Sequence, residues 1–324
     1  MSLLHFKFSG TTYEQGLAHG EALQESIAKN IDIYLNRFEN EAGISKNELL
    51  ENTGIYLNIL REQSPEYVNG MNGIAESSNL NMLEIAMLNL RYELLYHALG
   101  KLLQSEAVDG CTSFAVLPEA AENKHLLMGQ NWDWIPDVDC VLTTSIDSDG
   151  LQRMAFTEAG IFGGKPGMNS EGVGLTVNGM YSTDDDWSRF EKPFHLRCYE
   201  VLRSKNMEEA LHALAGTPRS CTANFILGHA PSRAIDIELA PDFFRQAGYF
   251  TCNSSGPPDH RPGKTDFNFL REEPFDGVLW SERTDGQPFY AQFNITDTHR
   301  DFTADPERPI DPAAVELPPY YPDH

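Results

Sequence analysis

The sequence predicts an α+β protein in which layered β-sheets are covered by helices. Three observations lead to this fold class. Apolar residues before position 110 recur at helical spacing, whereas those after position 111 fall in short, strand-like segments. A pair of helical segments interrupts these strands between residues 193 and 215. Because sheets and amphipathic helices must each bury an apolar face, this order favours sheets layered against helices.

Helices are predicted in the first part of the chain because their starts carry recognisable signals. Most of these signals are a capping side chain with a glutamate three residues later, and one is a proline at the first helical position. They are Thr11 with Glu14, Ser45 with Glu48, Ser64 with Pro65, and Asn81 with Glu84. The last of these helices is expected to stop at Gly100, since glycine commonly ends helices.

Strand-like segments rich in β-branched and aromatic residues follow Cys111. They cover residues 112–117, 125–132, 140–146, 151–157, 172–178, 224–227, 234–239 and 244–252. Helices are expected over 193–203 and 206–215. We expect residues 1–110 to form a helical segment and residues 111–324 a strand-rich part, together one structural domain.

The composition excludes several classes of partner. The 324 residues carry 24 basic and 48 acidic side chains, a formal net charge of −24, which repels nucleic acid and anionic lipid. No signal peptide is expected, and no stretch approaches the ~18 apolar residues of a membrane span. The five cysteines and ten histidines have neither disulfide-framework nor metal-site spacing. We therefore expect a cytoplasmic protein with no metal ion and no cofactor.

Gly110-Cys111 marks the change from helical to strand-like sequence and is the candidate reactive site. Scission of the bond between them would give Cys111 a free α-amino group beside its own thiol. Such an amine has a pKa near ~8, so it can accept the thiol proton at physiological pH. Thr112 and Ser113 add hydroxyl groups that can hydrogen-bond to reaction intermediates. The alternative is a buried structural cysteine, the commoner state of a free thiol.

Residues 130–134, which read Gln-Asn-Trp-Asp-Trp, end the strand expected to pair with the one after Cys111. A carboxylate at Asp133 could hold an ammonium group of Cys111 in place, and its alternative role is in a turn. Trp132 and Trp134 could line a pocket, although aromatic residues in strands more often belong to the core.

Two asparagines, Asn178 and Asn253, follow strand-like segments and are candidate oxyanion donors. A side-chain amide aimed at a developing oxyanion can lower an acyl-transfer barrier by about 3 kcal/mol. On the local sequence alone, a turn role for both residues is favoured.

Together these residues resemble the acyl-coenzyme A:6-aminopenicillanic-acid acyltransferase family of N-terminal-nucleophile hydrolases. The resemblance covers residues 10–255 and rests on the order and spacing of short motifs. They are Tyr13-Glu14-Gln15-Gly16-x-x-His19-Gly20, Gly73-Ile74-Ala75-Glu76, Leu88-Asn89-x-Arg91-x-Glu93, Asp109-Gly110-Cys111-Thr112-Ser113, Gly129-Gln130-Asn131-Trp132-Asp133, Pro166-Gly167-Met168-Asn169-x-x-Gly172 and the Asn253 region.

The resemblance implies an αββα four-layer sandwich with an N-terminal helical segment, and a precursor that cleaves itself before Cys111. Cys111 would be the nucleophile of self-processing and of turnover. Asp133 would orient its amine, and Asn253, with Asn178 as a second contributor, would form the oxyanion hole. Gln130 stands where related bile-salt and penicillin V hydrolases place an arginine, which argues against bile-salt-like substrates.

The resulting prediction is a self-processing cysteine amidohydrolase or acyltransferase that acts on a small N-acyl compound, with the thioester acyl-CoA as a further candidate substrate. Substrate contacts are expected from Gln130, Thr112, Ser113, Trp132 and Trp134. The two processed chains are expected to stay associated, and a homo-oligomer is compatible with this reading. The alternative is an inert relative that binds a small ligand or partner.

Two further segments need comment: the region after Asn253, which departs from the family pattern, and a glycine-rich segment at residues 163–166. After Asn253, where such enzymes add a further helix and closing strands, the chain is rich in Pro, Gly, Asp and Arg, and the segment 289–295 is a short strand candidate. Residues 163–166, Gly-Gly-Lys-Pro, are similar to a phosphate loop, but an upstream glycine is misplaced and proline replaces Ser/Thr. Nucleotide binding is therefore not predicted.

Overall fold

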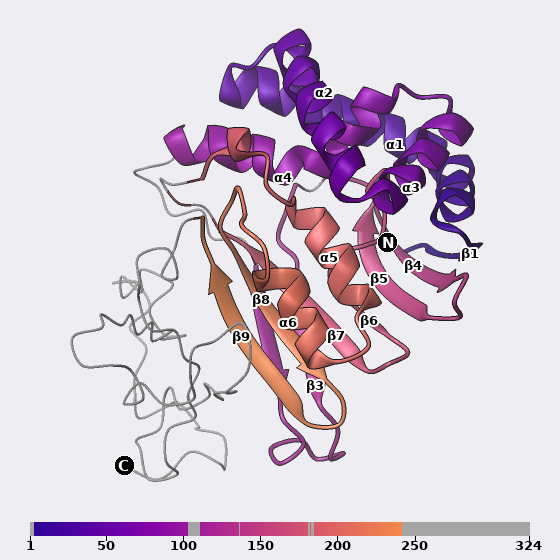
Figure 1. The fold of residues 1–324 in the computed structure, drawn as a ribbon, viewed down its shortest axis with the longest axis vertical. Helices are drawn as coiled ribbons and strands as arrows, with labels where there is room; N and C mark the ends of the chain where they lie inside the picture. Colours follow the sequence, from indigo (N-terminus) through magenta and orange to yellow (C-terminus); the bar gives the residue numbers. More distant parts are fainter. Residues whose placement is uncertain (1–2, 103–110, 136, 181, 183–184, 242–324) are drawn as a thin grey trace, which may run out of the picture. The chain divides into compact units, whose positions relative to one another are not determined.

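A seven-stranded β-sheet is the central element of the described residues (Figure 1). The computed structural model describes residues 3–102, 111–135, 137–180, 182 and 185–241. In sheet order, the strands are β1 His5–Gly10, β4 Cys140–Asp147, β5 Gln152–Glu158, β6 Gly167–Asn169, β7 Val173–Gly179, β8 Ala223–His229 and β9 Arg233–Leu239. Neighbouring strands are antiparallel except β1 and β4, which are parallel.

β1 and the three-residue strand β6 are not predicted by the sequence analysis, which expected only helices in the first part of the chain. In β1, Phe6 and Phe8 alternate with polar residues, the period of two that marks a half-buried strand. Phe8 is buried, and its ring lies 5.6 Å from that of His19 on the first helix. A single short alternation is a weak signal until a neighbouring strand pairs with it.

The described residues before Cys111 also form α1 Thr12–Ala42, α2 Lys46–Gln63, α3 Pro65–Ser78 and α4 Met82–Leu102. The predicted capping box of α1 is confirmed, since Thr11 Oγ1 accepts from the Glu14 N–H at 3.3 Å and Glu14 Oε2 accepts from the Thr11 N–H at 2.8 Å. Ser45 likewise caps α2. α4 continues past Gly100, where the sequence predicted its end.

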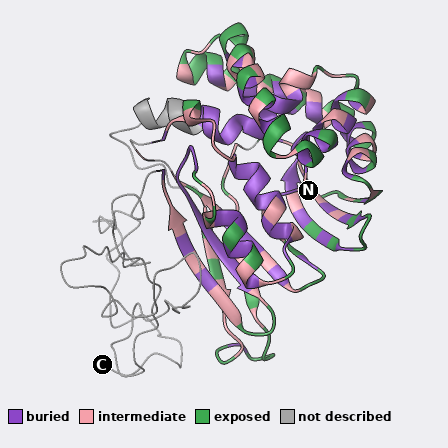
Figure 2. Cartoon of the chain, in the orientation of Figure 1, coloured by how far each residue is buried: buried purple, intermediate pink, exposed green. Residues whose placement is uncertain are grey.

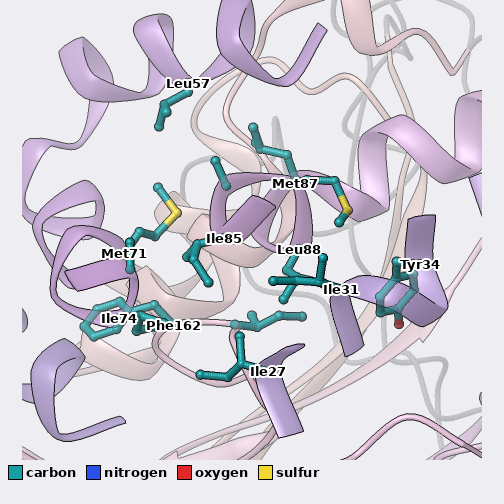
Figure 3. Close-up of a cluster of buried hydrophobic side chains, with 14 of the residues drawn as sticks. Ile27, Ile31, Tyr34, Leu57, Met71, Ile74, Ile85, Met87, Leu88 and Phe162 are labelled. Carbon is teal, nitrogen blue, oxygen red and sulfur yellow. The ribbon is translucent and has the colours of Figure 1, made fainter. Parts of the chain in front are cut away.

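Glycines let α1 and α3 cross at close range. A Cβ atom on Gly16 would lie 2.1 Å from the carbonyl oxygen of Gly70, and one on Gly73 would lie 2.3 Å from that of Tyr13. Apolar side chains from α1, α3, α4 and the loop after β5 pack together near this crossing (Figure 3). They include Ile27, Ile31, Met71, Ile74, Ile85, Leu88 and Phe162. The glycines of the first two sequence motifs therefore serve the helix crossing.

The sheet carries different partners on its two faces. α5 Phe194–Arg203 and α6 Met207–Ala215 pack on β6, β7 and β8, and β2 Thr112–Val116 with β3 Leu127–Asn131 forms a ribbon against β7 and β8 (Figure 1). In β8, Phe225 contacts Phe194 of α5 with ring centroids 5.7 Å apart, whereas the adjacent Asn224 faces the ribbon through Asn178. β8 is accordingly buried along most of its length (Figure 2).

This arrangement of helices and a large sheet confirms the mixed α and β class. The four-layer αββα sandwich and the division at residues 110 and 111 stay predictions. The expected strand 244–252 and the candidate 289–295 lie outside the described residues. Within the described part of the chain, no helix combines the length and apolar character needed to cross a membrane.

Candidate active site

Cys111 immediately precedes β2 and is half-buried. Its Sγ lies 3.8 Å from the backbone carbonyl oxygen of Asp133, in the segment after β3. The two residues meet because β2 and β3 are antiparallel, with Thr112 opposite Asn131 at the end of the ribbon. The ribbon therefore positions the candidate nucleophile beside the backbone of Asp133, whose side chain is exposed.

Cys111 lines a small pocket with a cavity volume of about 20 Å³. The other lining residues come from α4, the segment after β3, β7 and the start of α5: Arg91, Tyr92, Trp132, Trp134, Val177, Gly179 and Phe194. Tyr92 stacks on Phe194, with ring centroids 4.0 Å apart. The buried indole N–H of Trp132 has no hydrogen-bond partner among the described residues. The pocket thus has mainly aromatic walls.

The surroundings of Cys111 favour the neutral thiol over the thiolate. Burial raises its pKa above the ordinary value, and the Asp133 carboxylate raises it further. Backbone groups of Asp133 and Gly179 and the ammonium of Lys165 act in the opposite direction. Because the net shift is upward, the thiol is protonated at neutral pH and requires a base to become a nucleophile.

A chain of side-chain hydrogen bonds links the ribbon to the sheet at Asn178. Ser113 Oγ donates to Asn178 Oδ1 at 2.8 Å, and Asn178 Nδ2 donates to Asn224 Oδ1 at 2.6 Å. An amide nitrogen carries two hydrogens, so this bond to Asn224 uses one of them. Ser113 orients Asn178, and neither residue is among those that line the pocket, although the neighbours of Asn178 in β7, Val177 and Gly179, do line it.

Gln130 holds the ribbon against β7. Its Nε2 donates to the carbonyl of Val177, and its Oε1 accepts from the Val177 N–H at 3.1 Å. Both ends of this amide are therefore engaged with the backbone of one residue in the pocket wall. Thr112 is exposed. Of the residues expected to contact substrate, Trp132 and Trp134 line the pocket, and Gln130 and Thr112 do not.

A buried cluster of charged residues lies next to the two tryptophans, and the sequence analysis did not predict it. Glu158, at the end of β5, accepts from Arg91 Nε at 3.0 Å and from Tyr34 Oη at 2.6 Å, and it also pairs with Lys165. Arg91, Glu158 and Lys165 are each at most 2% exposed. Although burial raises the pKa of Glu158, Arg91 and Lys165 hold it well below its usual range.

The two cations of this cluster each lie over one of the tryptophans. Lys165 Nζ is 4.3 Å from the ring centroid of Trp132, and the guanidinium carbon of Arg91 is 5.1 Å from that of Trp134. Trp134 Nε1 also donates to Tyr34 Oη at 2.6 Å. Cation–π contacts are stronger where water is excluded, so these two buried cations help to hold the tryptophan rings in place.

The glycines that precede Lys165 are a local sequence signal for the loop that carries it. Gly160, Gly163 and Gly164 have φ values of 96°, 85° and 85°, a region that glycine reaches without strain. They turn the chain back after β5, so that the Lys165 N–H donates to the carbonyl of Phe156 at 3.0 Å. The glycines before Lys165 therefore shape a loop that returns to β5, in place of the phosphate loop to which residues 163–166 are superficially similar.

Two of the sequence candidates, Gly110 and Asn253, lie outside the described residues, so the proposed cleavage bond and one oxyanion donor stay predictions. Among the residues that the structure describes, no group of three or more His, Cys, Asp or Glu side chains could hold a metal ion.

Comparisons with known proteins agree with the resemblance drawn from the motifs. The family model described as acyl-coenzyme A:6-aminopenicillanic acid acyl-transferase matches residues 120–242, a range that includes Trp132, Asp133 and Asn178 and begins after Cys111. The acyl-coenzyme A:6-aminopenicillanic-acid-acyltransferase 40 kDa form of Emericella nidulans is 29% identical over 242 residues, which are 74% of this chain and 64% of that protein. The match thus spans less than two thirds of the fungal relative.

Proposed function

From the similarity of the chain to the acyl-coenzyme A:6-aminopenicillanic acid acyl-transferases, we propose that it is a self-processing acyltransferase or amidohydrolase with Cys111 as its nucleophile. The observation that carries the proposal is the place of Cys111, half-buried at the start of a strand and lining an aromatic pocket. A structural cysteine would instead be enclosed in the core, as Cys198 is.

Self-processing would begin with attack of Cys111 Sγ on the carbonyl carbon of Gly110. The proton that the thiol gives up passes to the Cys111 nitrogen as that nitrogen leaves, so that the peptide bond becomes a thioester. Water then hydrolyses the thioester to a carboxylate on Gly110, a free thiol and a free α-amine on Cys111. This amine is the base that the protonated thiol lacks in the uncut chain.

In turnover, the new amine accepts the thiol proton, and the thiolate attacks the carbonyl of an amide or thioester substrate. The leaving amine or thiol departs with a proton, and an acyl-enzyme remains on Cys111. Water or a second amine then takes the acyl group. The carboxylate of Asp133 is suited to hold the ammonium form of the amine.

The oxyanion formed in each step needs hydrogen-bond donors. Asn178 is proposed as one donor because it stands between the pocket-lining residues Val177 and Gly179, and because its bond to Asn224 uses only one of the two hydrogens on Nδ2. Asn253 is proposed as the partner donor on the family resemblance. The aromatic residues around the pocket favour an apolar acyl group, with acyl-CoA or a small N-acyl compound as its carrier.

Intact mass measured over time after purification tests the proposal. The full chain of 36.3 kDa should split into two polypeptides at Gly110–Cys111, and the cut protein should release acyl groups from a panel of N-acyl amino acids, β-alanyl amines and acyl-CoA thioesters. Cys111→Ala should abolish both events, whereas Cys140→Ala, which removes another half-buried thiol, should abolish neither. A wild-type chain that stays intact and inactive, or a Cys111→Ala variant that is cut, contradicts the proposal and favours an inert ligand-binding relative.

A further inference from the structure

Lys165 is a buried residue beside the pocket to which the proposed chemistry assigns no role. Its side chain is fully buried, and burial lowers the pKa of its ammonium to about 8 although Glu158 opposes the shift. The group therefore carries its charge at pH 7. Keeping a lysine charged in the interior requires a fixed partner, because desolvation of an ammonium is costly.

The contacts of Lys165 point toward Cys111. Glu158 anchors the ammonium on one side, and the ring of Trp132 receives it on the other at 4.3 Å. Trp132 in turn lines the same pocket as Cys111. The charge of Lys165 also acts directly on the thiol, where it opposes the effect of burial.

We propose that Lys165 is a positioning residue for Cys111. Glu158 holds the ammonium against Trp132, which keeps that indole in the pocket wall and places a fixed cation where it stabilises the thiolate. The inference rests on the proposed nucleophilic role of Cys111. It gives a function to the glycine-rich return loop, which brings Lys165 back to Glu158.

Several other titratable groups share this environment and belong in the design of a pH experiment. Those that interact with the charge of Lys165 or of Cys111 are Glu158, Arg91, Cys140, His195, Cys198 and Asp133. Burial raises the pKa of the Cys140 thiol to about 11, so Cys140 reacts more slowly than a free thiol at neutral pH. Alkylation must therefore be resolved by the mass of the peptide that carries Cys111.

The test is the pH profile of Cys111 alkylation by iodoacetamide in the full chain. Lys165→Met removes the charge but leaves Arg91 paired with Glu158, and it should slow alkylation at pH 7 by about threefold to tenfold. The wild-type and Lys165→Met profiles should converge above about pH 9, where Lys165 loses its own proton. Lys165→Arg should keep the faster rate to higher pH, since a guanidinium does not deprotonate there.

Lys46→Met is the matched control, because Lys46 also pairs with a glutamate, Glu84, but on an exposed surface, and its profile should equal that of the wild type. If circular dichroism shows that Lys165→Met is unfolded, Lys165→Gln replaces it. A profile unchanged at pH 7 in the folded neutral variant, or a slowing that persists undiminished above pH 9, overturns the inference. The profile is read on the thiol itself, so it tests Lys165 even if the wild-type chain is never cut and never turns over a substrate.

Discussion

Asn178 illustrates how a single side chain can be committed to one orientation. Ser113 occupies its oxygen and Asn224 accepts from its nitrogen, so the amide cannot rotate without losing both bonds. A donor fixed before reaction needs no reorganisation when charge develops on the substrate, which is why such groups are effective in acyl transfer.

Replacing Asn178 with alanine should lower kcat of the processed enzyme by about 100-fold, because one oxyanion donor is lost. Ser113→Ala removes only the bond that orients the amide and should have a smaller effect. Steady-state rates of acyl release with the best substrate of the panel measure both variants. Equal losses in the two variants, or a full rate in Asn178→Ala, would remove Asn178 from the proposed oxyanion site.

At the scale of elements, the crossing of α1 and α3 depends on the absence of side chains at a few positions. The carbonyl oxygen of Gly70 lies 2.1 Å from the position that a Cβ of Gly16 would take, and backbone atoms cannot move aside as a flexible side chain can. The apolar side chains around the crossing hold the two helices at this separation.

Gly16→Ala should therefore lower the free energy of unfolding by about 1–3 kcal/mol, since overpacking forces the helices apart. Gly54→Ala is a matched control in α2, where the nearest atom to a new Cβ is Leu83 Cδ2 at an ordinary 3.6 Å. That variant should gain up to about 1 kcal/mol from the better helix propensity of alanine. Urea unfolding of the two variants measures both changes, and destabilisation of similar size in each would contradict the close-contact explanation.

For the whole molecule, buried ionisable groups set how stability changes with pH. His19 is 3% exposed, its Nε2 accepts from the Gly160 N–H at 3.0 Å, and burial lowers its pKa to about 4. The folded value lies below the unfolded value, so between about pH 6.5 and pH 4 the unfolded chain binds a proton that the folded chain does not. Stability from this group is present at neutral pH and is lost as the pH falls.

Acidification from pH 7 to pH 4 should therefore cost the wild type about 3 kcal/mol through His19. His19→Gln should unfold with a correspondingly weaker pH dependence, even if it is less stable at pH 7. Urea unfolding at pH 7, 5.5 and 4.5 gives the slope for each protein. Glu93 has the opposite effect on the pH dependence of stability, because burial raises its pKa to about 7. Its contribution to the free energy of unfolding is present at low pH and is lost as the pH rises from about 4.5. Parallel slopes for wild type and His19→Gln would show that His19 does not contribute.

The sequence predicted those parts of the fold that depend on neighbours in the chain. The caps at Thr11 and Ser45 act over three residues, so their signals are complete in the sequence. Strands β4 and β5 lie where the segments 140–146 and 151–157, rich in β-branched and aromatic residues, predicted them. Proximity of Cys111 to the segment after β3 also follows from one hairpin-like pairing.

What the sequence could not predict depends on elements that are distant in the chain. Glu158 joins Tyr34 of α1, Arg91 of α4 and Lys165 of the return loop, and none of these residues reveals its partners locally. The amide of Gln130 was expected to face substrate, yet the sheet-to-ribbon contact engages it with Val177. Such contacts exist only once the layers are assembled.

The parallel pairing of β1 with β4 spans the two sides of the proposed scission point. His5–Gly10 pairs with residues 142–147. Cleavage of the backbone before Cys111 would therefore leave the two polypeptides joined by the hydrogen bonds between β1 and β4. The cleaved protein would then elute from gel filtration at the same volume as the uncut chain under native conditions. The two fragments would separate only in a detergent or denaturant that breaks the strand pairing.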